Sequence, residues 1–300
     1  MRIYYTDHFE LPLPSTHRFP MDKYRRLRQR VVQNDRHRND VLVVPPEATD
    51  DQLRLCHDQR YVGSVVDGTL TAAEIRRIGF PWSPKMVQRS RRSTGATIAA
   101  SRAAIQDGIS VNLAGGTHHA MHAAGEGYCV FNDAAVAIRT LQQQQVIRRA
   151  CVIDLDVHQG NGTAEILSND PTAFTFSMHG VKNFPLRKTA SDLDVSLPDG
   201  TDDAPYLNQL QSALRIVESA GPFDLAIYLA GADPYVDDRL GRLALTKSGL
   251  RDRDEMLIQW ATERSIPLAI AMAGGYAADI DDIVDIHAST VASAAAASVH

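Results

Sequence analysis

Three residues that can bind a metal ion stand at alternate positions in the short segment Asp154-Leu155-Asp156-Val157-His158. Because successive side chains of an extended strand point to opposite faces, Asp154, Asp156 and His158 share one face. A buried carboxylate costs free energy unless it is paired or bound to a metal. The segment therefore indicates a metal site, although a strand end with ordinary hydrogen-bonded polar residues would have the same sequence.

A further carboxylate, Asp233, follows Gly231-Ala232 and precedes Pro234. On its own, Asp233 would be interpreted as a turn or helix-capping residue. Together with Asp156 and His158 it completes a set of two carboxylates and one imidazole. Such a set suits a catalytic Zn²⁺ ion with an open coordination position, and it would also accept Fe²⁺ or Co²⁺.

Two other motifs contain groups that can move a proton or stabilise negative charge. The adjacent pair His118-His119 offers an imidazole that can exchange a proton with water. Tyr276, at the end of Gly274-Gly275-Tyr276, has a hydroxyl that can donate a hydrogen bond to a developing oxyanion. Each motif alone is weak evidence, because a tyrosine is more often a packed aromatic with a solvated tip.

Short apolar segments that alternate with longer helical patterns must position these residues. The apolar segments predict strands buried on both faces, at 2–5, 41–44, 110–114, 150–154, 172–177, 225–230 and 267–272. Helical patterns cover residues 21–38, 84–107, 133–144, 204–220, 246–263 and 279–297. This alternation predicts one α/β domain over residues 1–300, with an open, mostly parallel sheet flanked by helices on both faces.

The candidate residues follow directly after four of the predicted strands. Polar, glycine-rich segments begin after positions 114, 153, 230 and 273. In open α/β sheets, ligands bind beyond the carboxyl ends of the strands. We therefore expect the four segments to meet in one site at that edge of the sheet.

The composition narrows the classes of protein to consider. The chain has 300 residues, a formal net charge of -5 and 3 cysteines. So few cysteines without tight spacing predict no disulfide scaffold and a reducing, cytoplasmic location. The acidic balance argues against a nucleic-acid partner. No apolar run approaches the roughly 20 residues of a membrane span, so no membrane partner is expected.

Taken together, the motifs resemble those of the zinc-dependent histone deacetylase family, which includes acetylpolyamine amidohydrolases and acetoin-utilisation proteins. The matching segments are 115–120, 125–133, 154–163, 231–233 and 274–276, in the family's order. Segments 17–24 and 79–83 resemble the class IV branch. The resemblance implies an arginase/deacetylase fold and hydrolysis of the amide bond of an N-acyl-lysine in a peptide or protein, or of an acylated amine.

The resemblance also implies two ion sites. A Zn²⁺ site would be formed by Asp156, His158 and Asp233. A structural site for a monovalent cation, K⁺ in the family, would be formed by Asp154, Asp156, His158, Ser177 and the backbone of Met178.

For catalysis, the resemblance implies that His119 acts as general base and acid, and that His118, hydrogen-bonded to Asp154, supports the developing charge. Tyr276 would polarise the substrate carbonyl. The chain departs from many class I members in having Asn161 where they have Asp. Because an amide holds no negative charge, we expect His119 to have a lower pKa than in an Asp-paired site.

For substrate binding, the resemblance implies that the Gly127 carbonyl accepts the substrate N–H and that Tyr128 and Phe184 wall a narrow channel. Alternatives stay open. The acyl group could be a long fatty chain, and the substrate could be an acetylated polyamine, to which Asp237-Asp238 would be complementary. A binding protein without activity is a further alternative, disfavoured because every matched site residue is present. Gly160 stands where an arginase-like site would need a carboxylate, so one catalytic metal is expected.

Overall fold

The computed structural model describes residues 1–14, 16–34, 37 and 39–298. Its centre is an eight-stranded sheet in which all strand pairs are parallel, in the order β2-β1-β3-β8-β7-β4-β5-β6. The strands are β1 (Arg2–Tyr4), β2 (Val41–Val43), β3 (Ile109–Asn112), β4 (Ala150–Asp154), β5 (Ala173–Gly180), β6 (Leu193–Leu197), β7 (Leu225–Leu229) and β8 (Leu268–Ala271).

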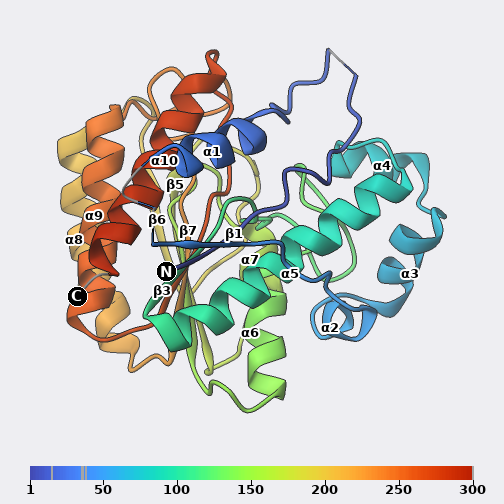
Figure 1. Ribbon diagram of the computed structural model, residues 1–300, viewed down its shortest axis with the longest axis horizontal. Coiled ribbons are helices and arrows are strands. Elements are labelled where there is room, and N and C mark those ends of the chain that lie inside the picture. Colours follow the sequence, from blue (N-terminus) through green and yellow to red (C-terminus); the bar gives the residue numbers. More distant parts are fainter. Residues whose placement is uncertain (15, 35–36, 38, 299–300) are drawn as a thin grey trace.

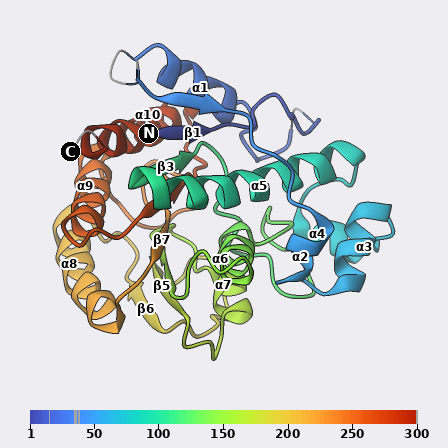
Figure 2. The ribbon, with the colours of Figure 1, turned by 60° about the horizontal axis from the view of Figure 1, so that its bottom comes forward.

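Helices cover both faces of this sheet (Figures 1 and 2). One layer contains α1 (Lys23–Val32), α8 (Asp203–Ala220), α9 (Lys247–Glu263) and α10 (Ile280–Ala297). The other contains α5 (Pro84–Asp107), α6 (Asp133–Gln143) and α7 (Asn161–Ile166). Three short helices lie beyond α5: α2 (Asp50–Arg54), α3 (Gln59–Asp67) and α4 (Ala72–Ile78). The expected open parallel sheet with helices on both faces is therefore confirmed.

The central strands are apolar throughout because each of their faces packs against a helical layer. In β7, Tyr228 belongs to the core beneath α8, α9 and α10, whereas its neighbours Ile227 and Leu229 belong to the core beneath α5 and α6. This alternation follows from the two-residue period of a strand. It explains why such strands lack the polar–apolar alternation of a half-exposed strand.

The sheet order brings together the four strand ends that carry the candidate residues. Strands β3, β8, β7 and β4 are consecutive neighbours in the centre of the sheet, although about 160 residues of chain separate the first of their loops from the last. The expectation that these segments meet at one edge is confirmed. Helix α6, which anchors one of these loops, begins after Asn132, whose side chain accepts a hydrogen bond from the Ala135 backbone N–H.

Several elements differ from the sequence prediction. Strand β6 was not expected, because it lies at the edge of the sheet and alternates exposed polar residues with half-buried apolar ones. The short helices α2, α3, α4 and α7 were also not expected, since they lack the repeated apolar spacing of longer helices. Strand β2, expected to be buried on both faces, is partly exposed at the opposite edge. Helix α1 ends at Val32, short of the predicted residue 38, and positions 35, 36 and 38 lie outside the described residues.

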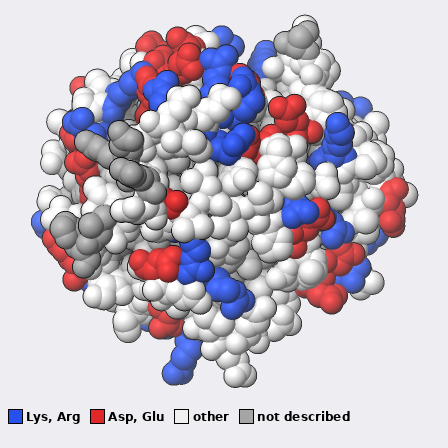
Figure 3. Space-filling model, viewed as in Figure 1, with Lys and Arg blue, Asp and Glu red and all other residues white. Residues whose placement is uncertain are grey.

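Three further features concern the cysteines, the length of the helices and the charged side chains at the surface. Cys56, Cys129 and Cys151 are buried and unbonded. None of the helices in the described part of the chain is long and apolar enough to cross a membrane. On the face of the molecule in Figure 3, small groups of basic and acidic side chains surround a largely uncharged centre.

Candidate active site

Asp156, His158 and Asp233 form a buried cluster of potential metal ligands, which we call the metal cluster. Asp156 and His158 follow β4, and Asp233 follows β7, the neighbouring strand. One ligand atom from each of the three residues lies within 4.8 Å of the others. His158 Nδ1 is 3.0 Å from Asp156 Oδ1 and 3.2 Å from Asp233 Oδ2. The residues predicted to bind a metal are thus brought together, and two carboxylates with one imidazole fit a divalent ion such as Zn²⁺.

Backbone groups hold the two carboxylates in place. The Val157 N–H donates to Asp233 Oδ1 at 2.9 Å, and the Gly274 N–H donates to Asp156 Oδ2 at 2.8 Å. Position 274 must be glycine, because a Cβ atom there would lie 2.1 Å from Asp233 Oδ2 and 2.5 Å from Asp156 Oδ2. The loop after β8 therefore packs directly against the ligand cluster.

The electrostatics of this cluster favour a positive charge between the carboxylates. Burial opposes charging of the His158 imidazole, but its hydrogen bonds to Asp156 and Asp233 prevail and raise its pKa to about 10. Burial, reinforced by the negative charge of Asp156, raises the pKa of Asp233 to about 7. Two carboxylates removed from water attract a cation, whether a proton or a metal ion.

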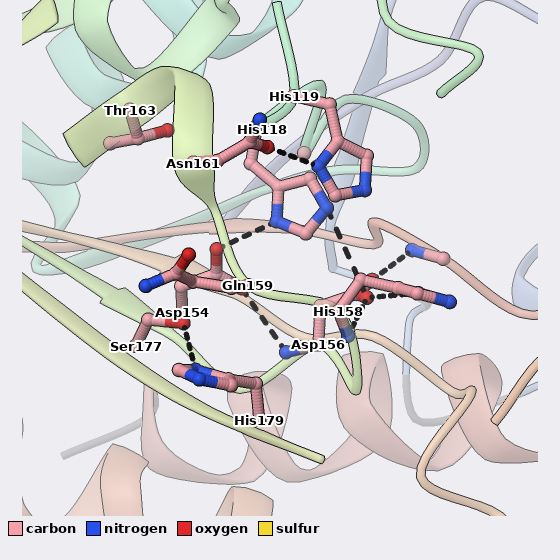
Figure 4. A network of polar contacts seen from close by, with 12 residues as sticks. His118, His119, Asp154, Asp156, His158, Gln159, Asn161, Thr163, Ser177 and His179 are labelled. Carbon is pink, nitrogen blue, oxygen red and sulfur yellow. Dashed lines mark hydrogen bonds and ion pairs between the residues drawn. The ribbon is translucent and has the colours of Figure 1, made fainter. Parts of the chain in front are cut away.

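The neighbouring imidazoles of His118 and His119 have partners of different charge (Figure 4). His118 Nδ1 lies 2.6 Å from the Asp154 carboxylate, and His119 Nδ1 lies 2.7 Å from the Asn161 carbonyl oxygen. Burial opposes charging of His118, but Asp154 and Asp156 outweigh it and raise its pKa to about 9. For His119, burial and then the nearby His118 hold the pKa well below its ordinary value. The pKa values of the two neighbouring imidazoles are therefore shifted in opposite directions.

The carboxylate of Asp133 holds the loop that carries His118 and His119. Asp133, the first residue of α6, accepts hydrogen bonds from the backbone N–H groups of Gly116 and Thr117 at 2.9 and 2.7 Å. Its carboxylate also accepts from the Thr97 and Thr117 hydroxyls. These hydrogen bonds hold the turn between β3 and the histidine pair in one conformation.

Tyr276 lies after β8, with its ring centroid 6.4 Å from that of His158. Its backbone N–H donates to Asp238 Oδ2 at 2.6 Å. The other oxygen of Asp238 accepts from the N–H groups of Leu240 and Gly241. Burial, with the negative charges of Asp233 and Asp156, raises the pKa of the Tyr276 phenol well above its ordinary value. The Tyr276 hydroxyl therefore stays protonated and can donate a hydrogen bond. The Asp238 carboxylate accepts hydrogen bonds from backbone N–H groups.

Two cavities meet at five of the candidate site residues. The outer cavity has a volume of about 600 Å³ and the inner one about 70 Å³. The residues that line both are His119, Gly127, Tyr128, His158 and Tyr276. Phe184 lines only the outer cavity, with its ring perpendicular to His119 and 4.9 Å away. The predicted channel residues Gly127, Tyr128 and Phe184 thus surround the approach to the metal cluster.

The residues expected around a monovalent cation also lie close together. Ser177 of β5 stands opposite Asp154 of β4 in the parallel register. The Ser177 hydroxyl is 3.0 Å from His179 Nδ1, and Figure 4 shows Ser177 and His179 beneath Asp154. Met178, the next residue along β5, is fully buried. A monovalent cation at these residues stays a prediction.

Three buried cations near the site were missed by the sequence analysis. Lys23 Nζ lies 3.3 Å from the Gly275 carbonyl and 3.4 Å from the Ala273 carbonyl. Arg253 Nη1 donates to the Gly231 carbonyl at 2.7 Å, behind the metal cluster. Arg89 lines the inner cavity. Each of these residues lies in a helix that contains several other charged residues. The sequence pattern therefore did not show which of the cations in each helix would be buried.

Comparisons with known proteins agree with this site. Residues 17–291 match the model of the histone deacetylase domain. The chain is 43% identical over 285 residues to an uncharacterised protein of Picosynechococcus sp., covering 95% of both chains. It is 31% identical over 270 residues to histone deacetylase 2 of Arabidopsis thaliana, covering 87% of this chain and 70% of that protein.

A solved structure shares the fold. The crystal structure of the HDA15 HD domain superposes with a TM-score of 0.81 at 20% sequence identity, covering 97% of this chain and 90% of that chain. The matched family model spans both the metal cluster and the histidine pair. The chain therefore belongs to the histone deacetylase family and is a hydrolase that acts on amide bonds of acetylated substrates.

Proposed function

We propose that residues 1–300 form one deacetylase domain that hydrolyses the amide bond of short-chain N-acyl-lysine side chains with one catalytic metal ion. The observation that carries this proposal is the meeting of three features at the junction of two cavities. These features are the Asp156–His158–Asp233 cluster, the two imidazoles hydrogen-bonded to Asp154 and Asn161, and Tyr276, which lines both cavities.

Asp156, His158 and Asp233 would hold the metal, with Zn²⁺ as the family expectation and Fe²⁺ or Co²⁺ as alternatives. When bound, such an ion supplies Lewis acidity that polarises the amide carbonyl and makes water a stronger acid. A single ion is supported by position 160, where even a Cβ atom would lie 2.3 Å from Asp154 Oδ2. No carboxylate side chain can therefore be placed there to bridge a second ion.

His119 is suited to the proton transfer. Because the Asn161 carbonyl accepts from Nδ1–H, the lone pair of a neutral His119 is on Nε2. Nε2 would take a proton from the attacking water and return it to the leaving nitrogen as the C–N bond breaks, giving a free amine and a carboxylic acid. His118, held charged by Asp154, would stabilise the negative charge that develops on the carbonyl oxygen.

Tyr276 and Gly127 would orient the substrate amide. The Tyr276 hydroxyl would donate a hydrogen bond to the carbonyl oxygen. This hydrogen bond would become stronger as negative charge develops on that oxygen. The Gly127 carbonyl would accept from the amide N–H. Glycine is needed at 127, since φ is 55° and a Cβ atom would lie 2.6 Å from the His119 ring. Tyr128 and Phe184 would flank the apolar part of the lysine side chain.

The inner cavity supports a short acyl group. Its volume of about 70 Å³ is roughly half the ~150 Å³ of an apolar cavity that accommodates benzene. An acetyl group is smaller than benzene, whereas a myristoyl chain is far larger. The volume thus favours acetyl over long fatty-acyl substrates, the alternative raised by the class IV resemblance. That branch assignment stays a prediction, as does a K⁺ ion beside Asp154 and Ser177.

The test is a release assay on two lysine peptides of one sequence, one acetylated and one myristoylated, with metal content measured in the same samples. We expect faster turnover of the acetylated peptide by protein that contains about one equivalent of metal. Faster turnover of the myristoylated peptide would overturn the short-chain assignment. Metal binding without turnover of either peptide would support a binding protein instead.

A further inference from the structure

The outer cavity, through which a substrate would reach the metal cluster, has a basic lining. Among the described residues that line it, one carries a carboxylate, Glu126. Four carry a fixed positive charge: Arg76, Arg77, Lys182 and Arg242. We call these four residues the basic rim. Since the whole chain has a net charge of -5, this excess of positive charge is a local property of the entrance.

The first pair of the basic rim is held at the channel wall by its backbone. Arg76 and Arg77 are exposed residues of α4. The Arg77 carbonyl accepts from the Gly127 N–H at 3.1 Å, and this fixes the end of α4 against the residue expected to bind the substrate amide. The carboxylate of Glu74, on the same helix, accepts from the backbone N–H and hydroxyl of Thr71 and also interacts electrostatically with Arg77. One carboxylate beside two exposed guanidinium groups leaves this pair with net positive charge at the entrance.

The second pair comes from loops that are hydrogen-bonded to each other. The Asn183 side chain donates to the Leu240 carbonyl at 2.8 Å, which joins the loop after β5 to the loop after β7. Lys182 and Arg242 flank this link, and each lies 3.4 Å from the same oxygen of Asp199. Their side chains remain 69% and 55% exposed. One shared carboxylate at that distance leaves this pair with net positive charge.

We propose, on the basis of the proposed function, that the preferred substrates are acyl-lysine residues in acidic peptide segments, with Asp or Glu beside the modified lysine. The acyl-lysine side chain is itself uncharged, so charge selection must act on the residues that flank it. Clefts lined by one sign of charge concentrate ligands of the opposite sign and raise their association rates about 10- to 1000-fold. The basic rim would accordingly repel polyamines and lysine-rich tails, although both are acetylated amines.

Three acetyl-lysine peptides of equal length test this proposal on the metal-loaded protein of residues 1–300. They carry glutamate, glutamine or lysine at the positions flanking the acetyl-lysine. We expect kcat/KM for the glutamate peptide to exceed that for the glutamine peptide by about 10-fold, with the lysine peptide lowest. This preference should shrink as ionic strength rises toward 1 M, where the screening length falls to about 3 Å.

Charge-reversal variants assign the preference to the basic rim. The double variants R76E/R77E and K182E/R242E should each lower the ratio of kcat/KM between the glutamate and lysine peptides about 10-fold. Arg215→Glu, an exposed change on α8 at the far side of the molecule from α4 in Figure 1, is the matched control and should keep the wild-type ratio. Equal kcat/KM for all three peptides would refute the charge preference and leave the proposed function intact. Hydrolysis of none of them would refute the proposed function itself.

Discussion

The carboxylate of Asp238 binds the backbone N–H of Tyr276, with 2.6 Å between Oδ2 and N. Two more N–H groups, those of Leu240 and Gly241, donate to its other oxygen. Asp238 therefore ties the loop after β7 to the loop after β8 and fixes the backbone from which the Tyr276 hydroxyl is directed. We regard it as a positioning residue.

Replacing Asp238 with alanine should displace Tyr276 while leaving the metal ligands in place. We expect kcat to fall about 10- to 100-fold, since a misplaced oxyanion donor loses part of its effect, with KM and metal content changed little. Asp237→Ala, at the exposed neighbouring position, is the control. An equal fall in metal content and kcat would show that Asp238 acts through the metal cluster instead.

Removing the hydroxyl of Tyr276 should remove the oxyanion donor itself. Tyr276→Phe is expected to reduce kcat by about 10²- to 10³-fold. The metal cluster should be unaffected, because in the described part of the chain the hydrogen bonds of the Asp156, His158 and Asp233 side chains run to backbone N–H groups and to one another. Steady-state kinetics with metal analysis make the measurement. Turnover at the wild-type rate would refute the role proposed for Tyr276.

A methyl group at position 274 should disrupt the metal cluster directly. In Gly274→Ala, the new Cβ atom would collide with carboxylate oxygens of both Asp233 and Asp156, so we expect metal affinity to fall by at least about 10-fold. The matched control is Gly63→Ala, on α3, where the added carbon would meet no described atom within 4 Å beyond the adjacent backbone of its own helix. That change should leave metal affinity unaltered and stabilise the helix by about 0.5–1 kcal/mol. Equilibrium dialysis and urea unfolding distinguish the two outcomes.

Giving His119 a charged partner should shift the pH dependence of hydrolysis. In Asn161→Asp, a carboxylate would replace the carbonyl that lies 2.7 Å from His119 Nδ1, and its negative charge would stabilise the imidazolium and raise the pKa of His119. Since a general base works in its deprotonated form, the acidic limb of the kcat/KM profile should move to higher pH. An acidic limb that stays in place would contradict this role of Asn161.

Away from the site, His57 should make the fold sensitive to acid. Burial lowers its pKa from 6.5 to about 4, while its Nδ1 and Nε2 bond to the Met121 carbonyl and the Asn132 N–H. Because the folded pKa is the lower one, the unfolded state takes up a proton first, and stability present above pH 6.5 is lost as pH falls toward 4. The loss is about 3 kcal/mol.

Urea unfolding between pH 7 and pH 4 measures this effect. His57→Gln removes the titration, so its free energy of unfolding should decline less steeply over the same range than that of the wild type. The comparison concerns the slope, because the substitution itself is also expected to lower stability at pH 7. Equal slopes would exclude His57 as a source of the acid sensitivity.

The central sheet and the meeting of the candidate residues at one of its edges could be predicted from the sequence because both rest on strong local patterns. Strands β4, β7 and β8 are almost entirely apolar and are followed within a few residues by polar or glycine-rich segments, and the ends of parallel strands must share one edge. The residues after these strands, among them Asp156 and Asp233, therefore converge whatever the details of the loops. Helix α5 was predicted with correct bounds, since Ser83 and Pro84 mark its start and Gly108 its end.

The features of the site that could not be predicted from the sequence are contacts between segments far apart in the chain. The bond from Asp238 to Tyr276 joins loops 38 positions apart, and Arg253 reaches the Gly231 carbonyl from an otherwise amphipathic helix. The basic rim combines arginines of α4 with Lys182 and Arg242, which are more than 100 residues away. Net charge, the only electrostatic quantity the composition supplies, has the opposite sign to the charge at the entrance.

The basic rim also bears on what happens after hydrolysis. The acyl-lysine that enters is neutral, but the lysine that forms becomes an ammonium ion, which must leave through the cavity that the four cations of the rim line. The same entrance that accepts the substrate therefore weakens the binding of its product. Product inhibition by the deacylated peptide should be feeble at low ionic strength, and the enzyme can continue to turn over as product accumulates.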